Sequence, residues 1–64
     1  MIERLPDGWE PGLSGDSWFK VDKYGTEWQS FVDKEEGLLF RTIEGWVTSP
    51  SRQLSEEEYE ELFG

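Results

Sequence analysis

A chain of 64 residues is long enough for one small domain with a single core, and it is too short for a multidomain enzyme. Its 15 acidic and 6 basic residues give a formal net charge of −9, which disfavours direct binding to nucleic acid or to anionic membrane surfaces. The absence of cysteine and histidine excludes disulfides, thiolate nucleophiles, imidazole bases and the usual zinc sites.

The hydrophobic composition indicates a folded domain rather than a disordered acidic tail. Aromatic residues make up 16% of the chain, and each large aromatic side chain can bury roughly 150–250 Å². No apolar run approaches the length of a membrane span, and the first residues lack the apolar region of a signal peptide. We therefore expect a single domain, residues 1–64, in the cytoplasm of the producing or host cell.

Residues 1–16 are expected to form an extended N-terminal arm, because closely spaced prolines and glycines disrupt both helix and strand. Leu5, Trp9 and Leu13 recur at intervals of four along this arm. We expect these side chains to anchor the arm to the domain.

Residues 17–49 are rich in aromatic and β-branched residues and are interrupted by short glycine-containing loops, a pattern typical of a β-meander. Loops at 22–25 and 34–37, with a turn at Glu44-Gly45, predict three to four antiparallel strands. In this register Lys20 lies opposite Glu27 as a favourable cross-strand pair.

The predicted register divides the apolar side chains between the two faces of the sheet. One face, which we expect the helix to cover, carries Phe19, Val21, Trp28, Val32, Leu39, Ile43 and Trp46. The second face carries Trp18, Phe31, Leu38, Phe40 and Val47. A three-residue first loop, which would pair Lys20 with Trp28, is disfavoured because it would place Glu27 and Gln29 beside the apolar residues of the first face.

Residues 55–63 predict a C-terminal helix that starts with a capping box, in which Ser55 is the N-cap and Glu58 follows three residues later. Tyr59, Leu62 and Phe63 share one side of this helix. A helix this short is marginal alone, so we expect it to dock on the sheet. The predicted fold is α+β: a small antiparallel meander, one helix packed on one sheet face, and an extended arm.

The second sheet face is more apolar than an ordinary solvated face, so something is expected to cover it. The two alternatives are the N-terminal arm and a partner, either another protein or a second copy of the chain. In the second case Trp18, Phe31, Leu38, Phe40 and Val47 are candidate apolar contacts.

Acidic residues concentrate in the predicted helix and in one loop. The candidate acidic contacts are Glu56, Glu57, Glu60 and Glu61 of the helix, with Asp33, Glu35 and Glu36 of the loop. These carboxylates either keep an aromatic-rich protein in solution or steer it toward a basic protein, and in the second case their spacing imitates DNA phosphates.

Catalysis and metal binding have little support in the sequence. A carboxylate pair of the glycosidase kind needs a cleft for which this chain has no room. The acidic loops lack the alternating oxygen ligands of a calcium-binding loop, and no phosphate-binding glycine motif is present. We expect no enzyme activity, metal or cofactor.

One segment resembles a known family. Leu5-Pro6-Asp7-Gly8-Trp9-Glu10, followed by Trp18-Phe19 and then Trp28, resembles the pattern of a WW domain. The resemblance implies that Phe19 and Trp28 grip proline-rich peptides in the polyproline II form. The chain departs from the family where a proline should follow the second Trp, because Phe31 stands there.

The sequence as a whole favours a non-enzymatic protein-interaction module. We expect it to inhibit or modulate a basic or nucleic-acid-handling protein, with DNA mimicry as one version, in the manner of a bacteriophage accessory protein. The alternatives are a WW-like binder of proline-rich peptides and a structural subunit that uses the second sheet face for a homodimer or an assembly contact.

Overall fold

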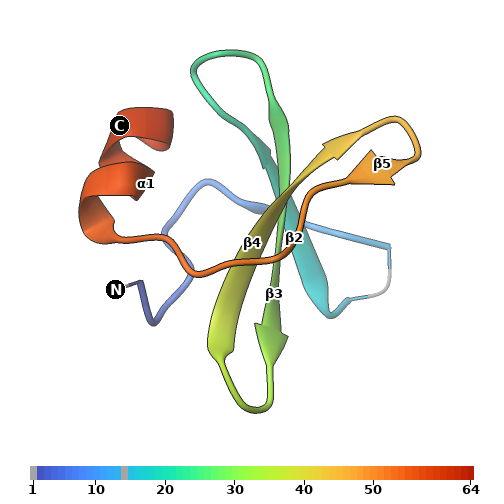
Figure 1. Cartoon of the computed structure of the whole chain (residues 1–64), viewed down its shortest axis with the longest axis vertical. Coiled ribbons are helices and arrows are strands. Elements are labelled where there is room, and N and C mark those ends of the chain that lie inside the picture. The colour runs from blue at the N-terminus through green and yellow to red at the C-terminus, as the bar shows by residue number, and fades with distance from the viewer. Residues whose placement is uncertain (1, 14) are drawn as a thin grey trace.

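A computed structural model describes residues 2–13 and 15–64, and in this part of the chain it shows a five-stranded antiparallel meander and one C-terminal helix (Figure 1). In chain order the elements are β1 (Glu10–Pro11), β2 (Ser17–Val21), β3 (Glu27–Asp33), β4 (Gly37–Glu44), β5 (Val47–Thr48) and α1 (Glu56–Phe63). The α+β fold is confirmed, whereas the prediction of three to four strands is too low. Residues 1 and 14 of the predicted arm lie outside the described residues.

The additional strand comes from the arm. Glu10 lies opposite Phe19 and Pro11 opposite Trp18, and the backbone amide of Gly12 donates to the carbonyl of Ser17 over 2.7 Å. Proline is tolerated here because β1 is at the edge of the sheet, where one side of the strand needs no hydrogen-bond donors. The arm is therefore extended, as expected, but part of it pairs with β2.

The predicted register is wrong by one residue in the β2–β3 and β3–β4 hairpins. The predicted turn at Glu44-Gly45 is also wrong, because Glu44 lies opposite Val47 and the turn consists of Gly45 and Trp46. Lys20 lies opposite Trp28, the arrangement that the sequence disfavours, and Ser30, rather than Phe31, lies opposite Phe40. Gly25 and Gly37 have φ angles of 87° and 83°, a left-handed conformation that glycine adopts without strain and that suits tight hairpin loops.

The reason for the observed register is a buried polar cluster around Asp22. The Asp22 carboxylate accepts hydrogen bonds from the amides of Tyr24 and Thr26, each 2.9 Å long, and from the indole nitrogen of Trp28 over 2.8 Å. A buried indole N–H needs such a partner. This cluster outweighs the solvent-exposed Lys20–Glu27 pair of the predicted register, because exposed ion pairs contribute little.

The core lies between one face of the sheet and a layer formed by both the arm and α1. Its buried residues are Trp28, Leu38, Phe40 and Leu54, and the partly buried side chains packed on them are Ile2, Leu5, Trp9, Tyr59, Leu62 and Phe63. The docking of Tyr59, Leu62 and Phe63 is confirmed, as are the anchors Leu5 and Trp9. Leu13 is fully exposed, so its predicted anchoring role is wrong.

The arm and α1 cover the same sheet face, and Figure 1 shows them on the same side of the strands. The Trp9 indole nitrogen donates to the Tyr59 hydroxyl over 2.8 Å, and the Trp9 and Phe63 rings lie 5.2 Å apart. The expectation that the arm could cover the face opposite the helix is therefore wrong.

The opposite sheet face carries a mixture of apolar and polar side chains. Phe19, Phe31 and Ile43 are half-buried there, and Leu39 is buried. Arg41 donates to the Gln29 side chain over 2.7 Å, and its guanidinium carbon lies 5.4 Å from the centre of the Phe31 ring. Of the residues predicted beneath the helix, only Trp28 belongs to the covered core.

Candidate protein-binding site

The N-terminal end of α1 is fixed by a complete capping box. The Ser55 hydroxyl accepts from the amide of Glu58 over 3.1 Å, and the Glu58 carboxylate accepts from the amide of Ser55 over 3.3 Å. Three glutamates in the first turn lie at the positive end of the helix dipole, which favours negative charge. The predicted cap is confirmed, and the helical residues are Glu56–Phe63.

Only one of the five helix carboxylates has a basic partner among the residues that the structure describes. Arg52 forms an ion pair with Glu58, and this contact, together with the hydrogen bond from the Ser55 amide, lowers the pKa of the Glu58 carboxyl. The last turn of α1 contains no basic residue. The four exposed glutamates that remain are those predicted as acidic contacts: Glu56, Glu57, Glu60 and Glu61.

Three of these glutamates border an open hollow between the arm and the helix. Its lining consists of Ile2 and Pro6 from the arm and Tyr59 from α1, with Glu56, Glu57 and Glu60, and its volume is about 530 Å³. The lining is mainly apolar. We call this feature the acidic hollow. It joins an apolar surface to a rim of negative charge, an arrangement suited to a partner that carries both apolar and basic groups.

The floor of the acidic hollow is held by aromatic contacts. Besides accepting the hydrogen bond from Trp9, Tyr59 lies 4.7 Å from the Phe63 ring and 6.2 Å from the Phe40 ring, measured between ring centres. Burial raises the pKa of the Tyr59 hydroxyl, and the Trp9 hydrogen bond offsets part of that rise. The phenol therefore stays neutral at physiological pH and presents a fixed surface.

The predicted acidic loop does not join this site. The Asp33 carboxylate accepts from the amides of Glu35 and Glu36, each over 2.9 Å, and these bonds lower its pKa. The side chains of Glu35 and Glu36 are exposed at the β3–β4 hairpin, which Figure 1 shows at a different end of the molecule from α1. The two acidic clusters are therefore separate.

The predicted apolar contact face does not exist as one surface. Phe40 is completely buried and Leu38 is 7% exposed, so both belong to the core beneath the arm and α1. Trp18 lies on the same sheet face as Phe40, whereas the shifted register moves Phe31 to the opposite face. Val47 is exposed on the edge strand β5.

The residues suggested by the WW-like pattern also separate. In the observed register Phe19 and Trp28 point to opposite sides of the sheet, and Trp28 is buried against Asp22. They cannot form the two walls of one peptide groove, so that part of the prediction is wrong.

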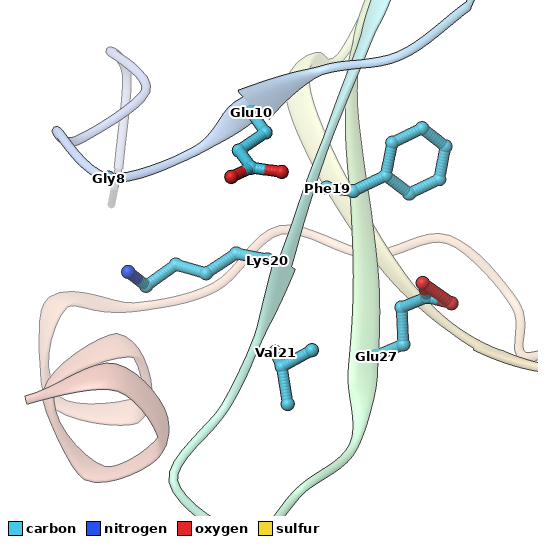
Figure 2. Close-up of a pocket in the computed structure, with 6 residues that line it drawn as sticks. All are labelled: Gly8, Glu10, Phe19, Lys20, Val21 and Glu27. Atoms are coloured by element: carbon cyan, nitrogen blue, oxygen red, sulfur yellow. The ribbon is translucent and has the colours of Figure 1, made fainter.

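A second, smaller hollow of about 250 Å³ lies near β1, β2 and β3. Figure 2 shows that its charged side chains diverge: Lys20 extends toward the side of α1, whereas Glu27 points to the other side of β2 and β3. In this view the Glu10 carboxylate lies between β1 and the Lys20 side chain. These side chains do not converge on one point, as binding of a small ligand would require.

Sequence reasoning finds the glutamates of the acidic hollow but misses its floor. Ile2 and Pro6 carry no signal of a binding role, and Tyr59 is expected only as a core residue. The available signal is the spacing of the arm anchors, which indicates that the arm docks but not that it docks beside α1. The packing of the arm against α1 depends on contacts between residues 50 positions apart, such as Trp9 and Tyr59.

The residues described by the structure include no group of three or more acidic side chains placed to hold a metal ion. The described helix is also too short and too polar to cross a membrane. Comparisons with protein-family models, with curated proteins and with solved structures find no match.

Proposed function

We propose that this protein is a non-enzymatic interaction module that binds a basic protein through α1 and so inhibits or modulates that protein. The observation that carries the proposal is the row of exposed helix glutamates that have no basic partner among residues 2–13 and 15–64, in a chain whose net charge is −9. Unpaired surface charge of one sign speeds encounter with an oppositely charged partner and selects against acidic partners.

A nucleic-acid-handling protein is the partner class that this charge pattern fits best. Such proteins expose lysine and arginine to hold phosphates, and helix carboxylates can occupy the same contacts. In this version the module competes with nucleic acid for the partner's basic surface. Its effect is inhibition, and added double-stranded DNA should displace it from the partner.

The proposal is tested by affinity capture with two variants of equal net charge. The first replaces the α1 glutamates with glutamine: E56Q, E57Q, E60Q and E61Q. The control replaces four exposed glutamates elsewhere: E10Q, E27Q, E35Q and E44Q. Wild type and control should recover the same basic protein from a host lysate, and the α1 variant should not. If the two variants recover the same amount of the basic protein, the proposal is refuted, because the position of the charges then does not affect binding.

A structural role is a second candidate, favoured by exposed apolar residues at the β4–β5 hairpin. Trp46 is 101% exposed and Val47 is 70% exposed, although the sequence predicts Trp46 beneath the helix. An apolar tip beside a short edge strand is a surface that a second copy or a larger assembly could cover. Sedimentation at increasing concentration tests the homodimer form, and a monomer at all concentrations would exclude it.

A further inference from the structure

We infer that the acidic hollow is the part of the protein that selects its partner, by accepting one apolar side chain flanked by lysine or arginine on a partner segment. This inference rests on the proposed function and makes it more specific. Charge on α1 alone would attract any polycation. A hollow with an apolar floor adds a preference for a segment that presents an apolar anchor.

The shape of the acidic hollow fits a side chain on a protein surface better than an enclosed small molecule. Its volume of about 530 Å³ is open to solvent, and it lies between the arm and the first two turns of α1. Deep ligand sites bury most of their ligand, whereas an open hollow buries only a protruding group of a larger partner. Ile2, Pro6 and Tyr59 supply the apolar contact for that group.

The hollow is already formed without a partner. The amide of Ile2 donates to the carbonyl of Leu54 over 3.3 Å, which ties the start of the arm to the segment that leads into α1. The Trp9–Tyr59 hydrogen bond ties the arm to the helix itself. Because these contacts fix the floor in advance, binding does not carry the entropic cost of ordering it.

The negative charges around the acidic hollow favour basic residues on both sides of the partner's apolar side chain. Glu56, Glu57 and Glu60 form the rim, and the described structure shows no ion pair between them and any lysine or arginine. Arg52, the nearest cation in sequence, is bonded to Glu58.

The experiment uses two short synthetic peptides of equal charge. The first carries a central leucine flanked on both sides by lysine and arginine, and the second carries serine in place of the leucine. Each is titrated into ¹⁵N-labelled protein while amide chemical shifts and affinity are measured. We expect the leucine peptide to bind roughly tenfold more tightly, because even partial burial of an aliphatic side chain is favourable. Shift changes should centre on Ile2 and residues 56–60.

Two variants test the contribution of charge position. A rim variant with E56Q, E57Q and E60Q should weaken both peptides, and a matched control with E27Q, E35Q and E44Q should weaken them less. Thermal unfolding of each variant confirms that it is folded.

The outcomes distinguish this inference from the function on which it rests. If the two peptides bind equally but the rim variant weakens both, the apolar anchor is refuted and the acidic interaction module stands. If the rim and control variants behave alike, both proposals fail, because binding then follows total charge. Shift changes confined to the opposite sheet face or to the β3–β4 hairpin would also overturn the inference.

Discussion

Replacing Asp22 with asparagine should destabilise the protein, because this carboxylate holds three donors in a buried position. The asparagine side chain keeps the shape and can still accept from loop amides, but it presents its own N–H₂ or a neutral oxygen to the Trp28 indole. Hydrogen bonds to a charged group contribute about 1.5–3 kcal/mol each, so we expect D22N to lose about 2 kcal/mol. For a domain of this size, that loss lowers Tm by roughly 10 °C.

The effect of D22N should also depend on pH. Burial would raise the pKa of Asp22, but hydrogen bonds from the Trp28 indole and the loop amides outweigh it and hold the pKa below its ordinary value of 3.8. A carboxyl whose pKa is lower in the folded state stabilises the fold above its unfolded pKa, and that stability disappears as the pH falls through the folded pKa. The difference between wild type and D22N should therefore be largest near neutral pH and shrink below about pH 4.

Urea unfolding of wild type and D22N at about pH 7 and about pH 2.5 measures both effects. D33N is the matched control, because Asp33 also accepts from two loop amides but is not bonded to an indole. We expect D33N to lose less stability than D22N. An unchanged free energy of unfolding for D22N, or a loss that is equal at both pH values, would refute the role assigned to the Asp22 charge.

Three further predictions concern stability and are measured by thermal or urea unfolding. Y59F removes the hydroxyl that accepts from Trp9 and should cost about 1 kcal/mol, and a neutral result would show that this bond does not hold the arm to α1. S55A removes the helix cap and should cost about 1 kcal/mol with reduced helical signal in circular dichroism; an unchanged spectrum and stability would contradict the capping box. G37A should cost about 1–2 kcal/mol through backbone strain alone, since no atom lies within 4 Å of the added Cβ, and a stabilising effect would contradict the left-handed φ of 83°.

The parts of the fold that sequence reasoning predicts correctly are those encoded locally. The capping box of α1 needs only Ser55 and Glu58, and the apolar side of the helix follows from the spacing of Tyr59, Leu62 and Phe63. The order of β2 to β5 follows from the glycine-containing loops, whereas β1 in the arm is not predicted. The exposed glutamates of the candidate site are identified for the same reason, since they lie on one short helix.

The register is missed because the deciding residues are polar and buried. Ser30 is completely buried and donates to the carbonyl of Leu39 over 3.1 Å, and Asp22 is 7% exposed. Asp22 falls in the predicted loop 22–25, where alternating hydrophobicity carries no information about the strand register. The one-residue shift then exchanges the side chains of whole strands between the two faces, which removes the predicted apolar contact surface.

The acidic hollow is lined by residues from both ends of the chain. It therefore forms only when the N-terminal arm packs against α1. Residues that lie 50 positions apart must meet before Trp9 can donate to Tyr59, and loop closure over such a distance is costly in entropy. Fraying of the arm would erase the site while leaving the meander intact. A bound partner segment would therefore stabilise the docked arm. It would slow hydrogen exchange at the amides of the arm, and it would raise Tm as its concentration increases.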